Sequence, residues 1–124
     1  MPTIATFTDK KASDVIIYEE PLARFSREAI KVTATVKIGD LLKESATVGT
    51  FEPATTAADF AAVRYVAIQN YDDVFADRMA VLARHCMVRE EKLNFPAGTT
   101  DAEKKLLADS LESSYQLLIR KQGI

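Results

Sequence analysis

The chain has 124 residues, which predicts one domain large enough to bury a core without disulfide bonds or structural metal ions. Its net charge of −2 gives no basic face, so nucleic acid and anionic membrane surfaces are not expected as partners. The single cysteine excludes an internal disulfide and indicates a reducing compartment.

The first part of the chain differs from the rest in having no regular apolar pattern. In residues 1–14, small and hydroxylated residues alternate with single apolar ones, so this stretch is expected to have no core of its own. A β-type run, Val15 to Tyr18, follows, and such residues are unusual in a disordered tail. They favour an arm that lies on a partner. We therefore expect an extended N-terminal arm over residues 1–28 and a folded domain over residues 29–124.

Several strands are expected in the central part of the chain. Apolar and polar residues alternate over residues 30–38, which is typical of a strand with one buried face. Residues 47–51 are compatible with a short strand, residues 59–63 fit either a helical turn or the start of the next strand, and residues 64–69 read as a strand. Residues 78–89 are apolar on both faces, which predicts one central buried strand.

The sharpest local signal is a helix start near residue 100. Thr100 is followed three residues later by Glu103, which predicts a capping box. Arg120 and Lys121 would lie in the last turn of this helix, and Gly123 would close it. The elements together predict an α+β fold: a small β-rich single domain with one C-terminal amphipathic helix.

The predicted helix has two apolar faces. Its main stripe consists of Leu107, Leu111, Tyr115, Leu118 and Ile119. Leu106 and Leu117 fall together about a quarter turn away at 100° per residue. Either both sets belong to the core, or Leu106 and Leu117 face another subunit, because a small domain rarely covers two sides of a terminal helix.

The residues give no pattern typical of catalysis. His85 and Cys86 are neighbours, so on a strand they would point to opposite faces and could not act as base and nucleophile. One histidine and one cysteine cannot form a common zinc site, and no phosphate-binding glycine motif is present. We therefore expect no enzyme activity, no cofactor and no metal.

The order of these features resembles the lambda-type head decoration proteins of tailed bacteriophages. The features that carry the resemblance are a Thr-rich arm, a strand and turn ending in Ile38-Gly39-Asp40-Leu41-Leu42, a strand at Tyr65–Gln69, the run Asp77–Val88, and the helix start Lys92–Lys104. The resemblance implies a non-enzymatic protein that assembles as a homotrimer on the outside of an expanded head and stabilises it. It also implies synthesis in the cytoplasm of the host bacterium, and an N-terminal arm that adds a strand to the major capsid protein.

Two sets of contact residues follow from this interpretation. For the capsid-binding arm, the candidates are Thr3, Ile4, Thr6, Phe7, Val15, Ile16, Ile17 and Tyr18. For the trimer interface, they are Tyr65, Leu106 and Leu117. Deleting residues 2–18 is expected to abolish capsid binding and to leave the fold and the trimer intact.

The rival interpretation is a small oligomeric ligand-binding domain or enzyme. Its pocket would lie between subunits and would be lined by Arg84 and His85. Binding to purified expanded capsids distinguishes the two interpretations.

Overall fold

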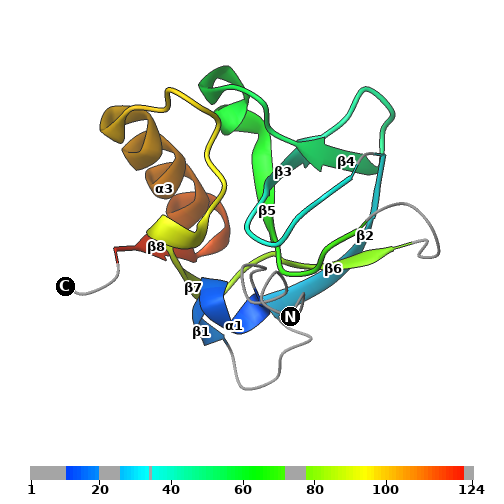
Figure 1. Ribbon diagram of the computed structural model, residues 1–124, viewed down its shortest axis with the longest axis horizontal. Helices are drawn as coiled ribbons and strands as arrows, with labels where there is room; N and C mark the ends of the chain where they lie inside the picture. The colour runs from blue at the N-terminus through cyan, green and yellow to red at the C-terminus, as the bar shows by residue number, and fades with distance from the viewer. Residues whose placement is uncertain (1–10, 20–25, 34, 72–77, 122–124) are drawn as a thin grey trace, which may run out of the picture.

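A computed structural model describes residues 11–19, 26–33, 35–71 and 78–121. These residues form a closed five-stranded barrel, a three-stranded sheet and one long helix (Figure 1). The barrel strands, in spatial order, are β2 (Arg27–Val32), β4 (Thr50–Pro53), β3 (Leu41–Glu44), β5 (Val63–Ala67) and β6 (Met79–Leu82). The second sheet consists of β1 (Ile16–Glu19), β7 (Cys86–Arg89) and β8 (Leu117–Arg120).

The helical elements are α1 (Ala12–Val15), α3 (Asp101–Tyr115) and the 3₁₀ helices η2 (Ala57–Ala62) and η3 (Glu90–Lys92). The predicted fold class is confirmed: the protein is a small, mostly β single domain with a C-terminal helix. The helical alternative for residues 59–63 is correct over most of its length, because η2 occupies residues up to Ala62 and β5 begins at Val63.

The alternating segment behaves as its period predicts. Ile30, Val32 and Val36 are buried, whereas Lys31 and Thr35 are exposed. The regular strand is shorter than expected, because β2 ends at Val32. Val36 then forms an isolated bridge with Tyr71: Val36 N donates to Tyr71 O at 2.9 Å, and Tyr71 N donates to Val36 O at 2.8 Å. The inward residues therefore continue to fill the barrel after the regular ladder ends.

The domain has two apolar cores that share a wall. One core fills the barrel, and the other lies between the barrel, the three-stranded sheet, η2 and α3. Adjacent residues of one wall strand face different cores: Leu41 packs in the outer core and Leu42 in the barrel. Tyr65 and Val66 divide in the same way on β5. This arrangement explains why several strands are apolar on both faces.

The run at residues 78–89 forms two strands, which corrects the prediction of one. β6 closes the barrel against β2, whereas β7 is the middle strand of the second sheet. The chain changes sheet at residues 83–85, where His85 has a φ of 52° and Ser26 Oγ donates to the His85 carbonyl at 3.2 Å. The polar pair Arg84 and His85 interrupts the apolar run at this change, but apolar residues on both sides of the pair made the run read as one strand.

The start of α3 is confirmed as predicted. Thr100 N donates to Glu103 Oε1 at 2.8 Å, and Glu103 N donates to Thr100 Oγ1 at 3.2 Å. The predicted end is wrong: α3 stops at Tyr115, and Gln116 adopts the left-handed conformation with φ 55°. β8 follows and pairs in parallel with β7, so Leu117, Leu118 and Ile119 lie on a strand. Gly123 lies outside the described residues.

Part of the expected arm belongs to the folded body. β1 pairs antiparallel with β7, with Ile16 opposite Val88 and Tyr18 opposite Met87. Val15, at the end of α1, is fully buried in the outer core. This corrects the extended arm of residues 1–28 for residues 11–19 and 26–28, because β1 pairs with β7 of its own chain and β2 begins at Arg27. Residues 1–10 and 20–25 lie outside the described part of the chain.

Candidate functional site

The segment that leads from residue 10 into the body is held by one arginine. Arg89 Nη1, on β7, donates to the carbonyl oxygens of Ser13 at 3.1 Å, Asp14 at 3.0 Å and Ile16 at 3.1 Å. A charged donor makes stronger hydrogen bonds than a neutral one. With Val15 buried next to these carbonyls in the sequence, Arg89 fixes the point at which the N-terminal residues join the body. We call residues 13–16 with Arg89 the N-terminal clamp.

Beside the clamp, the second sheet presents apolar side chains on its outer face. The register places Tyr18 opposite Met87, and Met87 opposite Leu118, so these side chains form a row across three strands. Tyr18 is 51% exposed and its neighbour Ile17 is 39% exposed. The β-type run therefore has one buried end, at Val15, and one exposed end.

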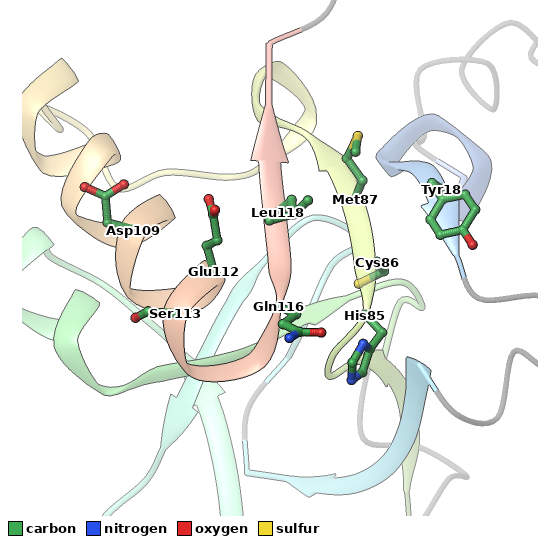
Figure 2. Close-up of a pocket in the computed structure, with 9 residues that line it drawn as sticks. All are labelled: Tyr18, His85, Cys86, Met87, Asp109, Glu112, Ser113, Gln116 and Leu118. Atoms are coloured by element: carbon green, nitrogen blue, oxygen red, sulfur yellow. The ribbon is translucent and has the colours of Figure 1, made fainter.

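A groove of about 640 Å³ lies between this outer face and α3 (Figure 2). Its lining comes from β1, from β7 and the bend before it, from α3, and from the start of β8: Tyr18, His85, Cys86, Met87, Asp109, Glu112, Ser113, Gln116 and Leu118. The two carboxylates in its lining form ion pairs with basic side chains: Asp109 pairs with Lys105 at 3.0 Å, and Glu112 lies 3.9 Å from Arg120.

The groove lacks an activated nucleophile. Burial raises the pKa of the Cys86 thiol to about 12, so the reactive thiolate is scarce at neutral pH. Arg84 is not among the residues that line the groove; it pairs with Glu28 on the barrel instead. Of the two residues that the rival interpretation places in a pocket between subunits, His85 lines this groove and Arg84 does not.

Two further classes of site are absent from the described residues. No group of three or more His, Cys, Asp or Glu residues there could hold a metal ion. No helix in the described ranges is long and apolar enough to cross a membrane.

Comparison with known families decides between the interpretations. Residues 6–115 match the family model described as bacteriophage lambda head decoration protein D. The chain belongs to this family. The match begins before the clamp and ends with the last residue of α3. A search of curated protein sequences gave no match.

Family membership gives the protein a role in decorating the phage capsid. The family consists of structural proteins of the head, which agrees with a groove that lacks an activated nucleophile. The resemblance seen in the sequence is confirmed.

The candidate capsid-binding residues of this decoration protein fall into three groups. Thr3, Ile4, Thr6 and Phe7 lie outside the described residues. Val15 is buried and Ile16 is half-buried, so their side chains contact the protein's own core. Ile17 and Tyr18 are exposed beside the clamp. Among the described candidates, these two alone are exposed.

The candidate trimer residues also separate. Tyr65 is 4% exposed, and its hydroxyl donates to Glu28 Oε1 at 2.9 Å. Leu117 is fully buried on β8. Burial within one chain removes both from a contact between subunits, which corrects this part of the prediction. Leu106 is 69% exposed on α3 and is the trimer candidate that the structure leaves available.

Sequence reasoning missed two residues that the structure brings forward. Arg89 gave no local signal, because its acceptors lie more than 70 residues earlier in the chain. Val48 is 86% exposed in the turn between β3 and β4. Val48 stands before Gly49 in a largely polar turn, which was a visible signal, but we read the segment as a loop with a possible short strand at residues 47–51.

Proposed function

We propose that this protein binds the outer surface of an expanded phage head as a homotrimer and stabilises the head by bridging neighbouring major capsid subunits. The observation that carries the proposal is the N-terminal clamp. Arg89 and the buried Val15 hold the chain at residues 13–16, which gives the N-terminal segment a fixed attachment point on the body.

A fixed attachment point makes a short arm effective. Residues 1–10 include Thr3, Ile4, Thr6 and Phe7, which suit addition of a strand to an exposed sheet edge of the major capsid protein. Ile17 and Tyr18 lie beside the clamp and would contact the capsid surface next to the arm. Because ordering an arm costs entropy, each arm binds modestly. Three arms on one trimer then act together through their effective concentration.

The proposal is tested by sedimentation with expanded heads that lack a decoration protein. The wild-type chain is compared with a variant lacking residues 2–10 and with a matched variant in which a Gly/Ser stretch of the same length replaces them. We expect the wild type to sediment with the heads and both variants to lose most of their binding, with far-UV circular dichroism unchanged. Bound protein should also raise the temperature at which heads break open.

Failure of the wild type to bind such heads at any concentration would refute the proposal. Equal binding by the wild type and by both variants would retain decoration and reject the arm as its means.

A further inference from the structure

The turn between β3 and β4 holds an apolar side chain in water. Val48 is 86% exposed, more than any other large hydrophobic residue in the described ranges. A side chain this exposed contributes little hydrophobic stabilisation to the fold of its own chain. Singly exposed apolar residues are common, so exposure alone proves little. The construction of this turn and a second surface on the same chain make Val48 informative.

The turn is tightly built around Val48. Ser45 N donates to Thr50 O at 2.8 Å, and the hydroxyls of these two residues lie 2.6 Å apart. Thr50 Oγ1 donates to Thr47 O at 2.7 Å. Gly49 supplies the positive φ of 87° that the turn requires. These hydrogen bonds restrain the backbone that carries Val48, which lowers the entropy lost when a partner buries it.

A matching apolar groove lies between η2 and α3. Its volume is about 350 Å³. The small side chains of Ala57, Ala58 and Ala61 form one wall, Phe60 lies at its buried side, and Leu106 forms the α3 wall. Leu106 is 69% exposed, second only to Val48 among the exposed large hydrophobic residues. The groove thus has room for a branched aliphatic side chain and apolar atoms to contact it.

Val48 cannot reach the groove of its own chain. β4 begins just after the turn and runs away from it, and η2 follows the other end of β4. In Figure 1 the turn projects at the upper right of the molecule, whereas α3 lies at the left. The side chain and the groove are therefore at different ends of one body, and a contact between them requires two copies.

The two surfaces also match in charge. Residues 45–49 carry no charged side chain. The groove has one, Glu103, and its carboxylate already accepts the N–H of Thr100. The carboxylate of Glu44, just before the turn, likewise accepts the N–H of Gly49 at 2.9 Å. Each carboxylate beside the proposed contact therefore keeps a backbone hydrogen bond of its own chain when the surfaces meet.

We propose that the Val48 turn of one copy of this chain occupies the η2–α3 groove of the next copy. Such a contact is heterologous, joining different patches of the two copies, and it closes into a ring when the rotation between them allows. The inference rests on the proposed homotrimer and assigns its repeating contact: three copies would make three identical Val48–Leu106 contacts.

Cross-linking tests the contact directly. The V48C/A58C variant is treated with a short bismaleimide, both free at high concentration and bound to heads. The native Cys86 is buried and its thiol is largely protonated, so it should not interfere. We expect covalent species of two and three copies. Each single variant alone should give no cross-linked species, because the contact joins different patches. An equal mixture of V48C and A58C should give cross-linked species of two copies and none of three.

A second measurement uses self-association, followed by sedimentation velocity of the free protein and by occupancy on heads. V48S and L106S should each weaken association about tenfold or more, the effect of withdrawing one buried aliphatic side chain. A46S and A102S are matched controls on the same turn and helix, and they should change nothing. The folds should be unaffected, since all four side chains are at the surface.

The outcomes separate this inference from the proposed function. Head binding by the wild type without cross-linking of V48C/A58C would overturn the contact and leave decoration standing. Cross-linked rings of a chain that never binds heads would support the contact and refute decoration. Unchanged association in both V48S and L106S would also overturn the contact.

Discussion

Replacing Val15 with alanine tests whether the N-terminal segment is part of the core. Val15 is fully buried among residues of the outer core, which include Val88 and Ile119. Two methyl groups are lost, which costs about 1.6 kcal/mol of transfer free energy at about 0.8 kcal/mol per group. The space they leave adds a cavity term, so the free energy of unfolding should fall by about 2–3 kcal/mol in all.

The matched control is Ile17→Ala, two residues away on the exposed end of the same segment. Ile17 is 39% exposed, so this change should cost less than about 1 kcal/mol. Urea unfolding followed by far-UV circular dichroism measures both variants, with the slope of free energy against urea as a check on two-state behaviour. For a chain of this size, the larger loss corresponds to a fall in Tm of about 8–12 °C.

Equal stability of Val15→Ala and the wild type would refute the packing of this segment. The expected result also revises the effect of deleting residues 2–18. From the sequence that deletion was expected to leave the fold intact. In the structure it removes Val15, α1 and most of β1, so it should destabilise the body, whereas deletion of residues 2–10 should not.

Three further predictions concern single positions. Thr100→Ala removes the hydroxyl that accepts from Glu103 N and should lower the free energy of unfolding by about 1 kcal/mol in urea unfolding. Gln116→Gly relieves the left-handed backbone and should raise it by about 0.5–1 kcal/mol in the same assay. Cys86 stays protonated in the fold up to about pH 12, so the unfolded chain alone loses this proton above about pH 9. Stability should therefore fall as pH rises from about 9 to 12, by up to about 1.4 kcal/mol per pH unit, and Cys86→Ala should lack this component.

Each of these predictions has a contradicting outcome. Unchanged stability of Thr100→Ala would mean that the cap contributes nothing, and a destabilised Gln116→Gly would mean that this side chain matters more than its backbone conformation. A wild type and a Cys86→Ala variant that lose stability equally above pH 9 would remove burial of the thiol as the cause.

Local chemistry made part of the fold predictable. The capping box at Thr100 needs only residues three apart, and the alternation from Ile30 to Val36 needs only a surface with one buried face. Both were therefore visible in the sequence. The end of α3 was not. Leu117 to Ile119 fits a helix stripe and a strand equally well, and Gln116 gives no glycine signal for its left-handed cap.

The candidate site shows the same limit. The run from Val15 to Tyr18 was correctly read as β-type from Ile16 onward, whereas Val15 ends α1. The alternatives considered for this segment were disorder and contact with a partner, and pairing within the chain was not among them. Backbone groups pair with β7 in the same way that they would pair with a capsid strand. Whether β1 pairs with β7 or with a capsid strand depends on residues far away in the sequence that bring β7 next to β1, such as Arg89. The position of those residues depends on the whole fold.

The separation of the two cores bears on how attachment and self-association can coexist. The clamp and the exposed end of β1 belong to the three-stranded sheet, whereas Val48 extends from a barrel hairpin. Both are rooted in the shared wall, since β3 leads into the Val48 turn and β6 leads through the bend at His85 into β7. Because neither surface uses residues of the other, V48S should weaken trimer formation without changing the intrinsic binding of one arm. Loss of residues 2–10 should abolish binding by the arm without changing trimer formation. The combined variant should bind heads no more weakly than the variant lacking residues 2–10 alone, since the effective concentration supplied by the trimer acts only when the arms are present.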